Sequence, residues 1–229
     1  MRTRHIGNPS PGRPVGDEAG ESAPAPRLSV ARRSGPAPVA AALVLHGGRS
    51  DSFAPVRPTQ LAVLRVRLLA AALYRRVGGA GTAVYRLEFA VRGWNGEVAS
   101  PVADARWALE RIRADLGDVP VVLVGHSMGG RTALRVAGAP QVRGVVALAP
   151  WTPPGEPVAQ LAGRRVLVAH GTADRITSPA QSREFTRRAA AAGADVEYVA
   201  VPGETHALLR RPRTWNGLVA RGVAEGLNR

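Results

Sequence analysis

The segment Gly125-His126-Ser127-Met128-Gly129 holds a serine with a glycine two positions away on each side. The apolar run at residues 121–124 predicts a buried strand directly before it, and residues 128–137 predict a helix directly after it. A serine on so sharp a turn adopts strained backbone angles, and small neighbours let the strand and helix approach each other. The N-terminus of the helix favours negative charge that develops nearby. The pattern predicts Ser127 as a nucleophile; the alternative is a glycine-rich turn whose serine caps a helix.

Alternating strands and helices surround this turn. The apolar patterns predict strands at residues 41–45, 82–89, 121–124, 144–148, 166–169 and 196–201, and helices at 60–77, 101–116, 128–137, 178–192 and 213–227. Apolar strands that alternate with helices are typical of a mostly parallel, doubly wound sheet with helices on both faces. We therefore expect an α/β fold. Neither a repeat nor a second domain is evident.

The first 38 residues differ from the rest of the chain. They contain seven prolines and five glycines, together with several arginines, and show almost no periodic apolar pattern. Such a segment buries too little apolar surface to offset its ordering entropy. We predict a disordered tail at residues 1–38 and a single domain at residues 39–229. A short strand at residues 27–32 is an alternative, because Leu28 and Val30 alternate with polar neighbours.

The composition limits the classes of function. The 229-residue chain has 31 basic residues, all arginine, and 17 acidic residues, which gives a formal net charge of +14. This charge could attract phosphate backbones, but the arginines are dispersed and aromatic residues make up only 4%. We therefore expect no nucleic-acid partner. The absence of cysteine excludes disulfides, cysteine nucleophiles and zinc–thiolate sites. Without a long apolar run or an apolar segment behind the basic start, we expect a cytoplasmic protein with no membrane contact.

The serine turn and the strand–helix order resemble the α/β-hydrolase fold superfamily, from about residue 40 to the C-terminus. The compact members without a cap, such as the dienelactone-hydrolase-like and carboxylesterase-like groups, are the most similar. That family presents serine, acid and histidine in this order along the chain. The segment His170-Gly171-Thr172-Ala173-Asp174 resembles its H-G-x-x-D pattern and implies Asp174 as the acid. Asp174 could instead cap a turn, and Asp195 and Glu197 are the other acids considered.

The resemblance also implies the base and the oxyanion donors. His206 follows the last predicted strand, where the family places its general base, although Thr205 stands where glycine is common. The other histidines are interpreted as parts of the tail (His5) or as structural residues (His46, His126 and His170). The family uses the backbone N–H of the residue after the nucleophile, here Met128, and a second N–H from the loop after the first core strand. Gly48 is our choice for that second donor, and Arg49 is the alternative.

Residues 150–164, between two predicted strands, are too few to build a helical cap and contain several prolines. We therefore expect an open, shallow site. Trp94 and Trp151 follow predicted strand ends, on the side where open α/β sheets bind ligands. They could form walls of the substrate pocket or could pack in the core.

These observations predict a serine hydrolase that acts on a small-molecule carboxylic ester, thioester or lactone through an acyl-enzyme. We expect neither a cofactor nor a metal, because no metal-ligand spacing, phosphate loop or dinucleotide fingerprint is present. Two alternatives stay open. One is a non-catalytic binding module with a basic surface, and the other is a perhydrolase or haloperoxidase-like enzyme with the same three residues. The sequence leaves the substrate and the oligomeric state undetermined.

Overall fold

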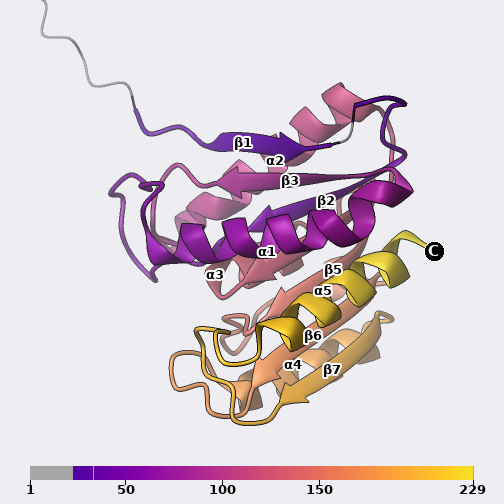
Figure 1. Ribbon diagram of the computed structural model, residues 1–229. Coiled ribbons are helices and arrows are strands. Elements are labelled where there is room, and N and C mark those ends of the chain that lie inside the picture. Colours follow the sequence, from indigo (N-terminus) through magenta and orange to yellow (C-terminus); the bar gives the residue numbers. More distant parts are fainter. Residues whose placement is uncertain (1–22, 33, 229) are drawn as a thin grey trace, which may run out of the picture.

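The computed structural model describes residues 23–32 and 34–228 (Figure 1). Within these ranges the strands are β1 (Arg27–Ala31), β2 (Ala40–Leu45), β3 (Thr82–Glu88), β4 (Val121–His126), β5 (Val142–Leu148), β6 (Arg165–Gly171) and β7 (Asp195–Val201). The helices are α1 (Leu61–Val77), α2 (Ser100–Leu116), α3 (Met128–Val136), α4 (Pro179–Ala191) and α5 (Pro212–Leu227). Three short 3-10 helices are η1 (Gly78–Ala80), η2 (Gly96–Val98) and η3 (Ala159–Leu161).

The seven strands form one sheet in the order β1-β3-β2-β4-β5-β6-β7. All neighbouring pairs are parallel except β1 with β3, which is antiparallel. The central strands β2 and β4 are buried along their whole length, since their runs of Ala, Val and Leu lie between two layers of helices. The predicted α/β fold with a mostly parallel sheet is confirmed.

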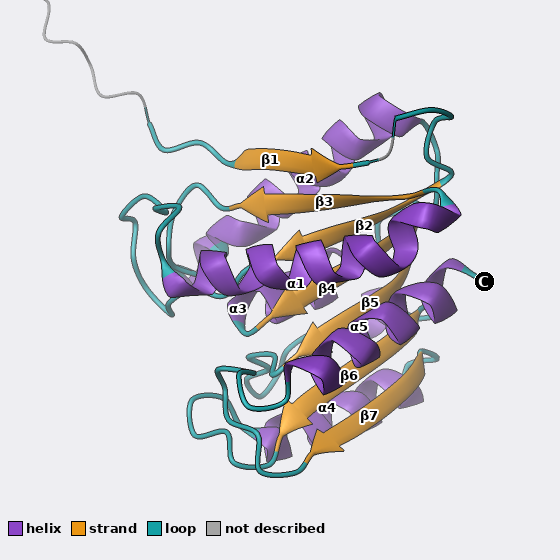
Figure 2. Cartoon of the chain, in the orientation of Figure 1, coloured by secondary structure: helices purple, strands orange, loops and turns teal. Residues whose placement is uncertain are grey.

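Helices cover both faces of the sheet (Figure 2). On one face, α1 and α5 lie side by side, and residues such as Val66 and Trp215 join the core beneath them. The other face is covered by α2, α3 and α4, where Ile112, Leu134 and Phe185 are among the buried side chains. The sheet is therefore the middle layer of three, as expected for a doubly wound fold.

The domain begins earlier than residue 39. Residues 27–31 form β1, an edge strand that pairs with β3 from Arg27 opposite Glu88 to Ala31 opposite Val84. Arg27 also donates a hydrogen bond to Glu88, at 2.9 Å. This stretch of the predicted tail is therefore part of the sheet, as the alternative strand at residues 27–32 anticipated. Residues 1–22, which make up most of the predicted tail, lie outside the described residues.

The parallel direction of the strands brings several connecting loops to one edge of the sheet. The loops that follow β2, β4, β6 and β7 all leave from the carboxyl ends of their strands. Ligands bind at this edge in open α/β sheets. Across the described ranges, no helix is long and apolar enough to cross a membrane.

Candidate active site

Ser127 lies on the sharp turn between β4 and α3. Its backbone angles are φ 57° and ψ −119°, a strained conformation for a residue with a side chain. A Cβ on Gly125 would lie 2.2 Å from the carbonyl oxygen of Gly129, and a Cβ on Gly129 would lie 2.5 Å from that of His46. Both positions therefore require glycine, because real side chains do not approach backbone atoms so closely. The predicted strand–turn–helix around Ser127 is present.

Three of the predicted site residues form one hydrogen-bonded chain. The Nε2 atom of His206 lies 3.0 Å from Oγ of Ser127, and its Nδ1 atom lies 2.8 Å from Oδ2 of Asp174. Both carboxylate oxygens of Asp174 accept hydrogen bonds, so Nδ1 carries the proton and Nε2 is left to accept one from the serine hydroxyl. Loops after β4, β6 and β7 supply the three side chains. The arrangement can take a proton from Ser127 and stabilise the resulting imidazolium.

Asp174 is held by more groups than His206 alone. Its Oδ1 atom accepts from the backbone N–H groups of Ile176 and Thr177, at 2.8 and 3.1 Å, and the hydroxyl of Thr177 lies 2.9 Å from Oδ2. Burial favours the neutral acid, but the hydrogen bonds from His170, His206 and these two N–H groups outweigh it and hold the pKa of Asp174 well below its ordinary value. The carboxylate therefore stays charged and fixed beside the imidazole.

The sequence did not identify two residues that contact this carboxylate. His170 is fully buried, and its Nε2 atom lies 3.1 Å from Oδ2 of Asp174, while its Nδ1 atom lies 2.9 Å from the hydroxyl of Ser182. Thr177 Oγ1 also lies 3.1 Å from Nδ1 of His206. An acid followed three residues later by threonine is a local capping pattern that could have indicated Thr177. For His170, no local sequence pattern indicates that its ring faces the acid.

Two backbone N–H groups lie beside Ser127. Met128 is the first residue of α3, so its N–H has no acceptor within the helix, and Gly48 lines the same cavity close to the Met128 side chain. Neither N–H donates to a backbone acceptor in the described part of the chain. The N–H of Arg49, the alternative donor, is already bonded to the carbonyl oxygen of Arg92 at 2.8 Å. Gly48 and Met128 are therefore the available pair.

An open cavity of about 520 Å³ lies over Ser127. Its lining includes Gly48, Met128, Trp151, Ile176 and Thr177. Between β5 and β6, the only regular element is the short 3-10 helix η3, so the described residues form no helical cap over the cavity. The predicted site without a cap is present.

The two candidate pocket tryptophans differ in position. Trp151 lines the cavity, whereas Trp94 is only 3% exposed and does not line it. The two rings meet edge to face at 6.1 Å, and the guanidinium of Arg131 lies 3.8 Å from the centre of the Trp94 ring. Arg131 is in turn paired with the fully buried carboxylate of Glu156 at 2.7 Å. Trp94 is therefore a packing residue behind Trp151, which is the second of the two positions that the sequence left open for it.

His126 lies directly behind the site, as a structural residue. Its Nε2–H donates to the carbonyl oxygen of His206 at 2.9 Å, and the two rings are 4.8 Å apart. Burial, with smaller electrostatic contributions from His206 and Arg65, lowers the pKa of His126 to about 3. The side chain therefore fixes the backbone of the His206 loop as a neutral donor.

This buried histidine should make stability depend on pH. Between pH 6.5 and 3 the unfolded chain binds a proton at His126 that the folded chain does not, so lowering the pH destabilises the fold by about 1.4 kcal/mol per pH unit. His126→Gln keeps an N–H donor for the carbonyl oxygen of His206 but cannot titrate. Urea unfolding at pH 7.5, 6 and 4.5 should show that the free energy of unfolding decreases less with falling pH for this variant than for the wild type. If the free energy of unfolding decreased equally for both proteins below pH 6.5, the low pKa of His126 would be contradicted.

The described residues contain no group of three or more His, Asp or Glu side chains that could hold a metal ion.

A family model described as the alpha/beta hydrolase fold matches residues 99–190, which include the serine turn and the H-G-x-x-D segment. The sheet order, the connections and this match identify the fold of the chain as the α/β-hydrolase fold. No curated protein sequence matches the chain significantly.

Several solved structures share the fold at low sequence identity. An α/β serine hydrolase homologue from Coxiella burnetii is 18% identical with a TM-score of 0.65, over 86% of this chain and 90% of that one. A serine hydrolase without lid from Xanthomonas campestris is 20% identical with a TM-score of 0.60, over 87% and 88%. A butyrate-bound esterase from Thermogutta terrifontis is 19% identical with a TM-score of 0.63, over 87% and 89%. These likenesses establish the fold.

Proposed function

We propose that the protein is a serine hydrolase that cleaves small-molecule carboxylic esters through an acyl-enzyme. The observation that carries the proposal is the hydrogen-bonded chain from Ser127 through His206 to Asp174, at 3.0 and 2.8 Å. A non-catalytic binding module would not require this chain of contacts beside an open cavity and two backbone N–H donors. Thioesters and lactones present the same electrophilic carbonyl and belong to the proposed substrate class.

In the first half of the reaction, Oγ of Ser127 attacks the ester carbonyl carbon while Nε2 of His206 takes the hydroxyl proton. The carbonyl oxygen gains negative charge, which the N–H groups of Gly48 and Met128 stabilise; one such donor is worth about 2.7–4 kcal/mol. Asp174 stabilises the imidazolium and keeps its ring oriented. The tetrahedral intermediate then collapses, and His206 gives the proton to the departing alcohol oxygen.

In the second half, a water molecule attacks the acyl-enzyme carbonyl and His206 takes its proton. The new intermediate releases the carboxylic acid and returns the proton to Oγ of Ser127. The open cavity beside Trp151 gives both the alcohol and the water direct access to the serine. The esterase from Thermogutta terrifontis, whose structure holds butyrate, supports a short acyl group as the first substrate to test. A cytoplasmic location and the absence of nucleic-acid binding stay predictions.

A fluorophosphonate probe tests the nucleophile without knowledge of the substrate. We expect the folded wild type to be labelled at Ser127, because the activated hydroxyl displaces the fluoride and forms a stable phosphonyl ester. Mass spectrometry of the labelled peptide gives the position, and Ser127→Ala should not be labelled. A folded wild type that stays unlabelled, or equal labelling of the variant, would refute the proposal. Esterase-negative protein that binds heparin at high salt would favour the binding module instead.

A further inference from the structure

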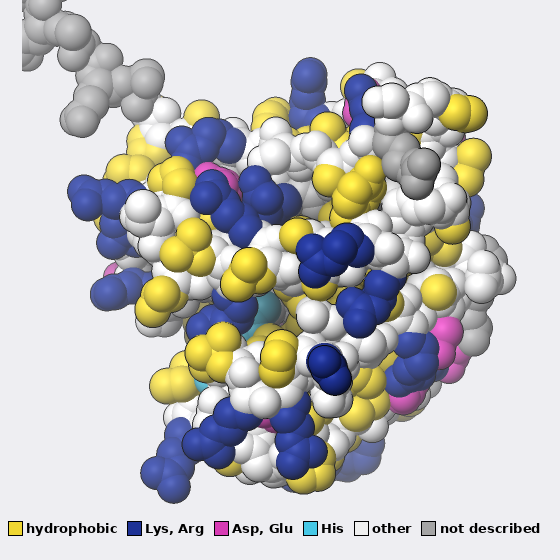
Figure 3. Space-filling model, viewed as in Figure 1, with side chains coloured by type: hydrophobic (Ala, Val, Ile, Leu, Met, Phe, Trp, Pro, Cys, Tyr) yellow, Lys and Arg dark blue, Asp and Glu magenta, His cyan; other side chains and the backbone are white. Residues whose placement is uncertain are grey.

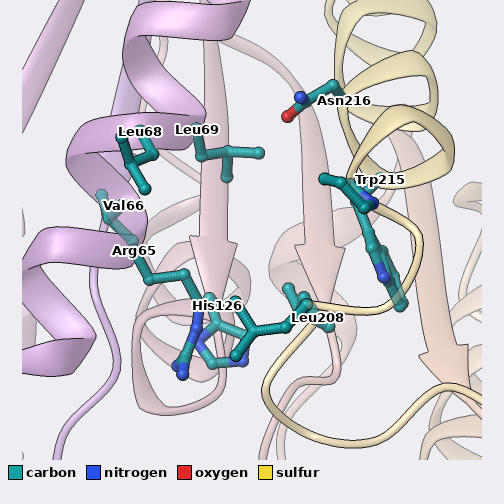
Figure 4. A pocket seen from close by; sticks show the side chains of 10 residues that line it. Arg65, Val66, Leu68, Leu69, His126, Leu208, Trp215 and Asn216 are labelled. Atoms are coloured by element: carbon teal, nitrogen blue, oxygen red, sulfur yellow. The ribbon is translucent and has the colours of Figure 1, made fainter.

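A second cavity lies behind the site, between α1 and α5. Its volume is about 120 Å³, and its walls are mostly apolar, with Val66 and Leu69 from α1 and Leu208 and Trp215 from the α5 side (Figure 4). It shares no lining residue with the cavity over Ser127. On this face of the molecule, Figure 3 shows apolar side chains between separate groups of arginines. An apolar cavity of about 150 Å³ can hold a benzene-sized group, so this one has room for a short hydrocarbon chain.

Arg65 supplies a charge at one end of this apolar cavity. Its side chain extends from α1 toward His126 (Figure 4), and its Nε atom is enclosed without a hydrogen-bond partner. Arg65 as a whole is only partly buried, and no carboxylate in the described part of the chain forms an ion pair with it. Partial burial lowers the pKa of its guanidinium. A planar guanidinium matches a carboxylate with two parallel hydrogen bonds. An anion is therefore the ligand that complements this end of the cavity.

His126 separates this cavity from the His206 loop. Its ring lines the cavity, while its Nε2–H is already used by the carbonyl oxygen of His206. The loop continues to Leu208, another wall of the cavity, which has a positive φ of 58°. A ligand in the cavity would thus contact the segment that carries the proposed base.

We propose that this cavity binds a short aliphatic monocarboxylate, with the carboxylate on Arg65 and the hydrocarbon chain between α1 and α5. Binding of the acid needs no catalytic activity. Only its relation to the reaction rests on the proposed function: such an acid is of the same class as the acyl product of ester hydrolysis.

Hexanoate is the probe, titrated by calorimetry into the Ser127→Ala protein so that turnover plays no part. We expect binding that Arg65→Gln weakens about tenfold or more, since hydrogen bonds to charged groups contribute strongly. Asn216→Trp, which places a large ring at the α5 side of the cavity, should abolish binding. Arg76→Gln, on the same helix but outside the cavity, should change the affinity less than twofold. Hexanamide, the neutral analogue, should bind far more weakly.

Imidazole NMR signals locate the bound acid. Hexanoate should shift the resonances of His126 in the Ser127→Ala protein and in the phosphonylated wild type, where the first site is blocked. The proposal is overturned if hexanoate does not bind, if both cavity variants bind it normally while circular dichroism shows them folded, or if phosphonylation abolishes binding. Hexanoate binding in a protein without esterase activity would contradict the proposed function and leave this second site standing.

Discussion

Ser127→Ala is expected to lower kcat for a short-chain p-nitrophenyl ester by roughly 10⁶-fold. His206→Ala should cause a loss of similar size. The hydroxyl of Ser127 is a poor nucleophile unless its proton moves to Nε2 of His206, 3.0 Å away, so the two groups act in a single step. Removing either one already removes that step. The double variant should therefore be no slower than the single variants, with the residual rate due to substrate binding and the oxyanion donors.

Single-turnover and steady-state assays with butyrate, hexanoate and octanoate esters measure this pattern. KM should change little, because neither side chain forms the walls that hold the acyl chain. Ser29→Ala, on the edge strand β1, is the matched control and should keep full activity. A Ser127→Ala protein with more than a hundredth of the wild-type rate, or a double variant whose loss equals the product of the single losses, would show that the two residues do not share one step.

The sharp turn at Ser127 could be predicted because its constraints are local. The turn needs glycine at positions 125 and 129, where any Cβ would meet backbone atoms, and the strand and helix on either side have clear apolar patterns. The family resemblance implied Asp174 and His206, and the structure places each of them just after a strand, β6 and β7, at the same edge of the sheet as the serine turn.

Other features depend on contacts between distant segments. Gly48 and Arg49 are equivalent in sequence, and only the hydrogen bond from Arg49 N–H to the carbonyl oxygen of Arg92 separates them. Trp94 and Trp151 both follow strand ends, but Arg131 from α3 packs on the Trp94 ring, which lies beneath the cavity wall. The strand β1 lies in a stretch rich in Pro and Arg, and it is ordered by pairing with β3. In this pairing Ser29 lies opposite Arg86, which is 57 residues further along the chain. No local pattern contains this information.

The contact between His170 and Asp174 also depends on segments that the local pattern does not relate. A histidine before glycine at a strand end is compatible with a structural role, which His170 does have through Ser182. Its second ring nitrogen nevertheless reaches the same carboxylate oxygen as His206. His170 lies within β6, and His206 follows the neighbouring parallel strand β7. The sequence pattern does not determine which way either ring faces.

Asp174→Asn is expected to lower kcat by about 10⁴-fold while the fold is retained. In the wild type, the carboxylate holds the Nδ1–H of His206 at 2.8 Å and stabilises the imidazolium in the transition state. An amide is neutral, and if its N–H group faces Nδ1 it favours the tautomer whose proton is on Nε2. That nitrogen then cannot take the proton of Ser127. Because the remaining donors to position 174 are unchanged, the loss should fall on kcat rather than on KM.

Asp195→Asn is the matched control and also tests the rival acid. Asp195 accepts a hydrogen bond from Arg165 at 3.2 Å at the start of β7, at the opposite end of that strand from the His206 loop. Its substitution should leave kcat within a factor of two. Thr177→Val removes one hydroxyl beside the carboxylate and His206 but leaves the charge, so it should cause a smaller loss than Asp174→Asn. If Asp195→Asn or Thr177→Val were the more damaging change, the orienting charge would not be that of Asp174, and the proton pathway from Ser127 would have to be reassigned.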